Sequence, residues 1–127
     1  MAKRVLLVMK RKLLSDSLME HAAIDSRFEL MSARDYSTAV LTAKMCLPEI
    51  AVVEIPESGA WRFAEKCFVI CDSIKRQFPC CKLVILCNEN DRDSYNAAIQ
   101  AKQESRIDDF LFYDSSIHYF FSKLESL

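Results

Sequence analysis

Five short apolar runs, separated by longer segments with helical spacing, constrain the fold of this chain more than any other feature. The runs are VLLVM at 5–9, FELMSA at 28–33, IAVVE at 50–54, KLVILC at 82–87 and DFLFY at 109–113. Three of them are almost continuously apolar, which is typical of parallel strands that are covered on both faces. Strands that alternate with helices predict an α/β fold, a five-stranded parallel sheet of the doubly wound (βα)5 type with right-handed crossovers.

The helical segments differ in how clearly they are amphipathic. The second and the last have one apolar face each, which comprises Tyr36, Ala39, Val40, Ala43 and Leu47 in the former and Ile117, Phe120, Phe121 and Leu124 in the latter. The second ends before Pro48, and the last begins at Ser116 and leaves His118 and Tyr119 facing outward. The first and fourth helices, near 13–24 and 92–105, show weaker stripes.

Length and charge exclude several classes of protein. A chain of 127 residues suits one domain spanning 1–127, and its formal net charge of −1 gives no electrostatic reason to bind nucleic acid or anionic lipid directly. The N-terminal apolar stretch is too short for a signal peptide or a membrane span. Without an export signal, the six cysteines are expected to be reduced thiols in the cytoplasm.

Chemistry in doubly wound sheets gathers where the strands end. The residues at these ends are Met9-Lys10, Glu54, Cys87-Asn88 and Tyr113-Asp114. The chain has one glycine, so no Gly-rich phosphate loop is present. Glu54 is therefore the notable residue, because a lone carboxylate closes an apolar strand just before an Ile-Pro pair.

The layout of VLLVMK, PEIAVVEIP, KLVILCN and DDFLFYD resembles the receiver domain of bacterial two-component response regulators. The resemblance spans essentially the whole chain and implies a CheY-like, flavodoxin-like fold with strand order 2-1-3-4-5. It also implies a cytoplasmic role in signal transduction through a phosphorelay. A working receiver holds Mg²⁺ with an acid pair after the first strand and an acceptor aspartate, and it ends the fourth strand with Ser/Thr and the fifth with Lys-Pro.

Carried over by position, this chemistry is missing from the chain. The acid pair falls on Met9 and Lys10, and the acceptor aspartate falls on Glu54. The hydroxyl residue falls on Cys87, and the Lys-Pro pair falls on Tyr113-Asp114. The family's switch aromatic is retained as Phe110. Methionine and lysine side chains supply none of the oxygen ligands that Mg²⁺ requires, so we expect Mg²⁺ binding to be lost and no other cofactor or metal to be bound. The resemblance therefore implies a degenerate receiver (pseudo-receiver), which is not an enzyme and signals without phosphorylation.

Several interpretations of Glu54 and its neighbours stay open at this stage. Glu54 is either an exposed strand-end acid, or the partner of Lys10 in place of a metal, or a retained acceptor or ligand contact. A residual phosphoacceptor at Glu54 is one alternative function. Another is a small-ligand or redox sensor that uses a pocket around Met9, Glu54, Cys87 and Tyr113, since these residues make the strand ends more apolar.

Candidate partners follow from the resemblance and from the aromatic residues. In the receiver family, dimers and output domains dock on the face made by the fourth helix, fifth strand and fifth helix. On this face the candidates are Tyr95, Lys102, Arg106, Phe110, His118 and Tyr119. We expect a homodimer through it, and an output domain absent from this chain would carry any role in transcription. Trp61 and Phe68, at the edge of the third helix's stripe, are either large rim residues or a further protein-binding surface.

The remaining cysteines and histidines indicate no catalytic site. Cys67 and Cys71 lie in the stripe of the third helix and are expected in the core. Cys80 and Cys81 precede the fourth strand in a turn and are expected to be partly exposed, with a redox role as the less favoured reading. His21 and His118 are far apart in sequence and lack a nucleophile partner.

Overall fold

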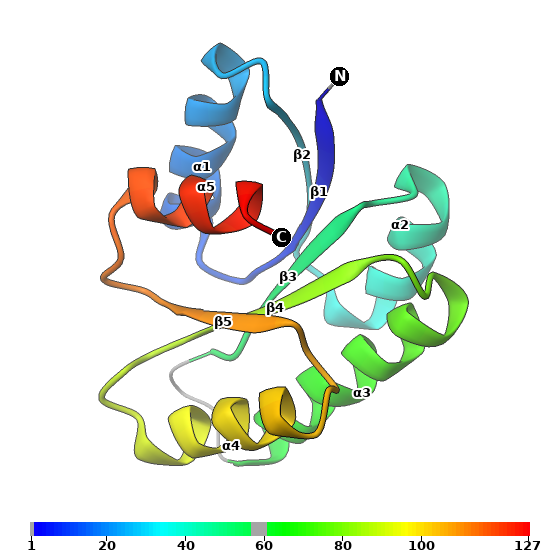
Figure 1. The fold of residues 1–127 in the computed structure, drawn as a ribbon, viewed down its shortest axis with the longest axis vertical. Helices are drawn as coiled ribbons and strands as arrows, with labels where there is room; N and C mark the ends of the chain where they lie inside the picture. The colour runs from blue at the N-terminus through cyan, green and yellow to red at the C-terminus, as the bar shows by residue number, and fades with distance from the viewer. Residues whose placement is uncertain (1, 57–60) are drawn as a thin grey trace.

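The computed structural model describes residues 2–56 and 61–127, without the side chains of residues 61–63. These residues form a twisted sheet with helices on both faces (Figure 1). The elements are β1 (Lys3–Val8), α1 (Lys12–Ile24), β2 (Phe28–Ala33), a short 3₁₀ helix (Tyr36–Thr38), α2 (Ala39–Cys46), β3 (Ile50–Glu54), α3 (Trp61–Gln77), β4 (Lys82–Cys87), α4 (Arg92–Gln103), β5 (Asp109–Phe112) and α5 (Ile117–Glu125).

The five strands are parallel and lie in the order β2-β1-β3-β4-β5, which confirms the predicted fold class. β3 is central and pairs with β1 on one side and β4 on the other. Helices α1 and α5 cover one face of the sheet, and α2, α3 and α4 cover the other (Figure 1). All strand C-terminal ends therefore meet at one edge, as the sequence predicted.

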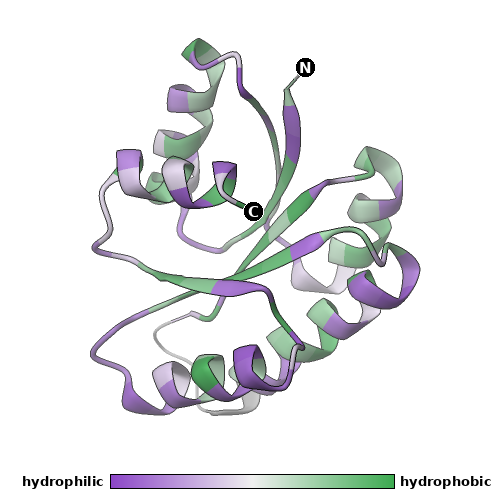
Figure 2. Ribbon diagram, in the orientation of Figure 1, coloured by the Kyte–Doolittle hydropathy of each residue, from purple (hydrophilic) through white to green (hydrophobic). Residues whose placement is uncertain are grey.

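Each face of the sheet has its own apolar core. Along β1, Leu6 and Val8 point to the layer of α2, α3 and α4, whereas Val5 and Leu7 point to α1 and α5. In Figure 2 the strands are mostly green and the outward faces of the helices are purple. This double burial explains why the strands read as continuous apolar runs and not as alternating ones.

The C-terminus of α2 departs from the helical pattern. Leu47 was expected on the buried stripe, but its side chain is 54% exposed. The cause lies in the backbone, since Leu47 ends the helix in the left-handed conformation with φ 50° and ψ 62°. For a residue with a Cβ this conformation costs about 1–2 kcal/mol, and glycine is the usual choice.

Two further features concern the start of the second helical segment and the length of the helices. The second helical segment starts as a 3₁₀ turn, because the Asp35 carboxylate accepts a hydrogen bond from the Ser37 amide and begins the turn before α2. None of the helices in the described part of the chain is long and apolar enough to cross a membrane.

Candidate functional site at the ends of the strands

Glu54 ends β3 and its side chain is fully buried. One carboxylate oxygen, Oε1, accepts hydrogen bonds from the backbone amides of Lys10 at 2.6 Å and Arg11 at 3.2 Å. The other, Oε2, accepts a hydrogen bond from the Tyr113 hydroxyl at 2.6 Å and lies 3.7 Å from Nε of Arg11. The interpretation of Glu54 as an exposed acid was therefore wrong, since the carboxylate is enclosed by donors.

The register of the sheet explains this arrangement. Val8 pairs with Val53, so the turn after β1 lies beside the end of β3. Arg11 is the N-cap residue of α1, and its own side chain caps nothing. The Glu54 carboxylate accepts from the amides of the two residues that precede α1 and places a negative charge near the positive end of the helix dipole.

The positive charge beside Glu54 comes from Arg11 and not from Lys10. Lys10 bonds Glu54 through its backbone amide, while its ammonium lies 5.6 Å from the centroid of the Tyr36 ring. The interpretation in which Lys10 pairs with Glu54 was therefore wrong, and the next residue, Arg11, makes the ion pair. Sequence reasoning missed Arg11, although the basic run KRK directly after the first strand was a visible signal.

Tyr113 occupies the position that the resemblance assigns to lysine, and it contacts Glu54 in a different way. Its hydroxyl lies 2.6 Å from Glu54 Oε2 and 2.9 Å from the carbonyl oxygen of Ile55. The Arg11 guanidinium lies over its ring, 4.0 Å from the centroid. Arg11 and Tyr113 therefore form a stacked pair, and both members face the same carboxylate.

The backbone carbonyl of Glu54 is also held. It accepts hydrogen bonds from the Tyr36 hydroxyl at 2.6 Å and from Sγ of Cys67 at 3.3 Å. Burial raises the pKa of Tyr36 and raises that of Cys67 to about 12, and the Glu54 charge adds to both shifts. Both groups therefore stay protonated and remain donors. The sequence placed both residues in the core, and nothing in it indicated their bonds to Glu54.

The other two strand-end positions named from the resemblance, Met9 and Cys87, are buried. Met9 and Cys87 are both 0% exposed, and Met9 packs in the core beneath α1 and α5. Burial, followed by the charge of Asp91, raises the pKa of the Cys87 thiol to about 12. Within residues 2–56 and 61–127 no group of three or more His, Cys, Asp or Glu is placed to hold a metal ion. The side chains of Met9 and Lys10 thus do not fit the Mg²⁺ site of the receiver family.

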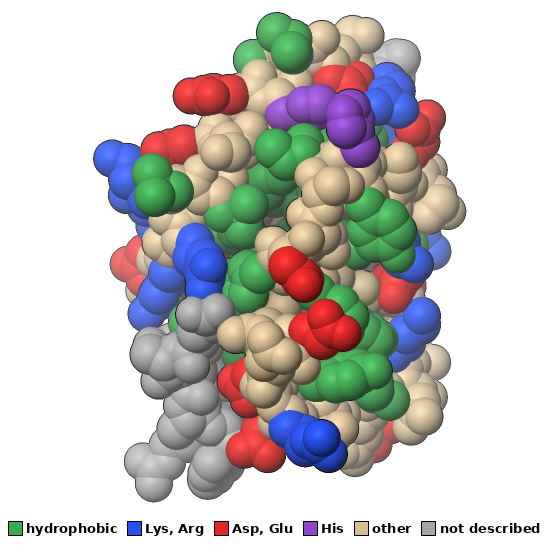
Figure 3. All heavy atoms as spheres, turned by 90° about the vertical axis from the view of Figure 1, so that its left-hand side faces the viewer, with side chains coloured by type: hydrophobic (Ala, Val, Ile, Leu, Met, Phe, Trp, Pro, Cys, Tyr) green, Lys and Arg blue, Asp and Glu red, His purple; other side chains and the backbone are tan. Residues whose placement is uncertain are grey.

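The face made by α4, β5 and α5 carries a half-buried aromatic cluster. The rings of Tyr95, Phe110 and Phe112 pack together with centroids 5.5–6.1 Å apart. Tyr119 on α5 is 53% exposed, and His118 beside it is exposed as predicted. Figure 3 looks onto the adjoining side of the molecule, where the loops after the strands lie, and hydrophobic side chains reach the surface there in several patches.

Asp109, at the start of β5, organises the lysines of this face. It accepts hydrogen bonds from Lys102 at 3.1 Å and pairs with Lys123 at 2.7 Å. Burial of the carboxyl acts to raise its pKa, but the bonds from Lys123, from the Phe110 amide and from Lys102 outweigh it, so the pKa is lowered. Lys102 is exposed and is paired with Asp109 within the chain.

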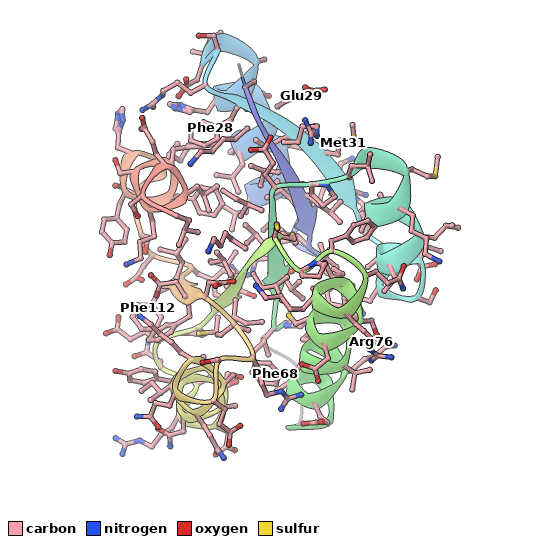
Figure 4. All side chains as sticks on the ribbon, turned by 45° about the vertical axis from the view of Figure 1, so that its right-hand side comes forward. Phe28, Glu29, Met31, Phe68, Arg76 and Phe112 are labelled. Atoms are coloured by element: carbon pink, nitrogen blue, oxygen red, sulfur yellow. The ribbon has the colours of Figure 1, made fainter. Side chains whose placement is uncertain are left out.

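Two interface candidates are not on a free surface. Phe68 is only 3% exposed, because it lies on the side of α3 that faces α4 (Figure 4). The Arg106 guanidinium lies 5.3 Å from the Phe68 ring centroid and pairs with Asp72 of α3 at 2.8 Å. The prediction of Phe68 as a binding residue was therefore wrong, and Arg106 faces α3. The side chain of Trp61 lies outside the described residues.

The remaining cysteines and histidines are placed as follows. Cys67 and Cys71 are buried, as predicted, whereas in the turn before β4 only Cys80 is exposed and Cys81 is 2% exposed. The two histidines, remote in sequence, meet on the surface of α1 and α5, with ring centroids 5.9 Å apart (Figure 3). His21 also stacks on Phe121 at 4.7 Å, so it packs at the core boundary.

The strand order and the two helical layers define the class of fold, which is that of the receiver domains of response regulators, the CheY-like fold. The structures that match include the receiver domain of NtrX from Brucella abortus, with a TM-score of 0.77 and 18% identity over 96% of this chain and 95% of that one. A response regulator from Thermotoga maritima matches with a TM-score of 0.76 and 15% identity, over 99% of this chain and 97% of that one. A CheY-like receiver domain protein from Methanospirillum hungatei JF-1 gives 0.76 and 12% identity, over 99% and 93%.

The similarity is confined to structure. No family model matches the sequence, and no curated protein is similar to it in sequence. With identities of 12–18%, these matches establish the fold.

Proposed function

We propose that residues 1–127 form a degenerate receiver domain, a phosphorylation-independent module that signals through protein contacts and is not an enzyme. One observation carries this proposal: the carboxylate at the acceptor position is fully buried, and both of its oxygens are already bonded by groups of the same chain. Cytoplasmic location and an output domain with a role in transcription belong to the same proposal.

The chemistry of phosphoryl transfer supports it. An acceptor carboxylate must reach the phosphorus atom, and a metal ion must neutralise the charge that develops on the transferred group. Glu54 has no exposed surface, and both of its carboxylate oxygens accept hydrogen bonds from amides and a hydroxyl of the same chain. The side chains at positions 9 and 10 do not fit a magnesium ion. We therefore regard the residual phosphoacceptor as the weaker alternative.

The alternative function, a small-ligand or redox sensor at the same strand ends, has little support in the structure. Met9, Glu54 and Cys87 have no exposed surface to offer a ligand. The pKa of the Cys87 thiol, raised to about 12 by burial, keeps it neutral at physiological pH, whereas the thiolate is the reactive form. Neither observation favours redox sensing at this site.

Incubation with acetyl phosphate and Mg²⁺, followed by intact mass measurement, tests the proposal. We expect no phosphoryl group on the wild-type chain, while a phosphorylatable receiver treated in parallel gains one. Stoichiometric addition that is abolished by Glu54→Gln would overturn the proposal. Glu54→Asp should also stay unmodified, because the shorter acid still lacks a metal site.

We further infer that protein contacts are made through the face of α4, β5 and α5. Support comes from the half-buried cluster of Tyr95, Phe110 and Phe112 and from the exposed Tyr119, since aromatic residues are enriched at interfaces. The inferred partner is a second copy. Sedimentation analysis should show a dimer that Tyr119→Ala weakens, while Val69→Ser on α3, which removes an equally exposed apolar side chain, leaves it unchanged. A wild-type chain that stays monomeric at high concentration would contradict this inference.

A further inference from the structure

A cavity of about 560 Å³ opens at the opposite edge of the sheet, where the strands begin. It is lined by Lys3 and Arg4 of β1, by residues 47–50 between α2 and β3, by residues 77–82 between α3 and β4, and by Leu127. Ile50 begins the strand that Glu54 ends, so the two sites lie roughly 13 Å apart along β3. The volume is in the range of pockets that enclose small molecules.

The wall of this cavity contains the strained residue at the end of α2. Leu47 holds a left-handed backbone conformation where glycine would be unstrained, yet its apolar side chain is 54% exposed and is not part of the core. Arg4 fixes the wall, since its Nε donates to the Leu47 carbonyl at 2.9 Å and its Nη1 lies 3.5 Å from Oε1 of Glu49. This conformation ends α2, where the Leu47 amide donates to the Ala43 carbonyl at 2.8 Å, and it leaves an exposed apolar side chain at the cavity.

The lining of the cavity combines an apolar floor with a cationic rim. Ile50 and Cys81 are each 2% exposed, and Phe78 is half-buried beside them. Among the lining side chains, those of Lys3, Arg4 and Lys82 are cationic and that of Glu49 is a carboxylate, which Arg4 pairs. The Lys3 ammonium donates to the backbone oxygens of Glu125 and Leu127 at 3.1 and 3.2 Å. Lys82 is exposed and makes no ion pair with any residue that the structure describes. The uncompensated charge is therefore positive.

We propose that this cavity binds a small amphipathic carboxylate, with its apolar body against Leu47, Ile50 and Phe78 and its carboxylate at Lys82. A cationic rim over an apolar floor matches that chemistry, because the anion would meet an ammonium with no competing partner while the body leaves water. The proposal does not depend on the role of Glu54, which lies at the other end of β3.

Calorimetric titration with dodecanoate, below the concentration at which it forms micelles, tests the proposal on the whole chain. Leu47→Gly should weaken binding about tenfold, as expected for loss of an apolar contact of this size, without lowering the melting temperature, because glycine suits the left-handed conformation. Lys82→Met should weaken dodecanoate binding until this variant binds dodecanoate and dodecanol with the same affinity. The matched control Leu41→Ser removes a 59% exposed leucine of α2 that does not line the cavity, and it should bind as the wild type does.

The cavity also contains a reporter thiol. Cys80 is exposed and lines the cavity, so dodecanoate should slow its alkylation by a maleimide. The proposal would be overturned if dodecanoate showed no saturable binding. It would also be overturned, in favour of general surface adsorption, if Leu47→Gly and Leu41→Ser bound dodecanoate equally well, or if the wild type bound dodecylamine as tightly as dodecanoate. Glu54→Gln should bind dodecanoate as the wild type does, so failure here is separable from failure of the proposed signalling function.

Discussion

Replacing Tyr113 with phenylalanine should destabilise the fold by about 2 kcal/mol. The substitution removes one hydroxyl and keeps the ring on which the Arg11 guanidinium stacks. The lost hydrogen bond, 2.6 Å long, reaches a buried carboxylate, and bonds to charged groups contribute about 1.5–3 kcal/mol. The Ile55 carbonyl at 2.9 Å adds little, because a hydroxyl has a single proton to donate. Glu54 keeps its amide donors, so the cost stays below that of an unpaired buried charge.

Urea unfolding followed by circular dichroism measures this effect. The midpoint should fall at an unchanged slope, and the melting temperature should drop by roughly 6–10 °C for a chain of this size. Tyr95→Phe is the matched control, since the Tyr95 hydroxyl makes no hydrogen bond with the described residues and its ring is half-buried. Its effect should stay within about 0.5 kcal/mol.

A double-mutant cycle decides whether the hydroxyl acts through Glu54. If it does, Tyr113→Phe should cost far less in a Glu54→Gln background, with a coupling of about 1 kcal/mol or more. The reasoning is refuted if Tyr113→Phe costs no more than Tyr95→Phe, or if the effects of the Tyr113 and Glu54 substitutions are simply additive.

Three more outcomes follow from residues elsewhere in the chain. The pKa of Asp109 is lowered in the folded chain, so its carboxylate stabilises the fold fully at pH values above the ordinary pKa of 3.8. This stabilisation is lost as the pH falls through the lowered pKa. Asp109→Asn should therefore cost about 1–3 kcal/mol at pH 7, and urea midpoints measured at falling pH should converge with those of the wild type. A thiol-reactive dye at pH 8 should label only Cys80 quickly and all six cysteines in denaturant, because burial raises the pKa of the other five; fast labelling of a second thiol would contradict this. Ser105→Gly should stabilise the chain by about 0.5–1 kcal/mol in urea unfolding, since Ser105 follows α4 with φ 61°; a loss of stability would show that its side chain matters more than its backbone.

The sheet was predictable from the sequence because strands that are buried on both faces consist almost entirely of apolar residues. Runs such as IAVVE and KLVILC contain almost no polar residue, and each became a strand within a residue or two of the expected bounds. The amphipathic stripe of α5 was equally informative, with Phe121 buried and Tyr119 exposed. In both cases the local period of the pattern determines the structure.

The site was only partly predictable, because its donors are largely backbone groups and neighbours from other elements. The amides of Lys10 and Arg11 bind Glu54 whatever their side chains are, so a comparison of side-chain types named the wrong cation. Phe68 shows the same limit. Helical spacing placed it at the edge of the α3 stripe, but whether an edge is covered depends on α4, which packs there.

The enclosure of Glu54 restricts how this sequence can change. An aspartate at position 54 is one methylene shorter and would not reach both the amides of Lys10 and Arg11 and the Tyr113 hydroxyl. A substitution toward the acceptor of the receiver family therefore removes hydrogen bonds before any metal ligand exists at position 9 or 10. Arg11 and Tyr113 are in turn held in place by the carboxylate of Glu54. Single steps between this chain and a phosphorylatable receiver therefore pass through less stable intermediates, and the residues around position 54 should change together or not at all.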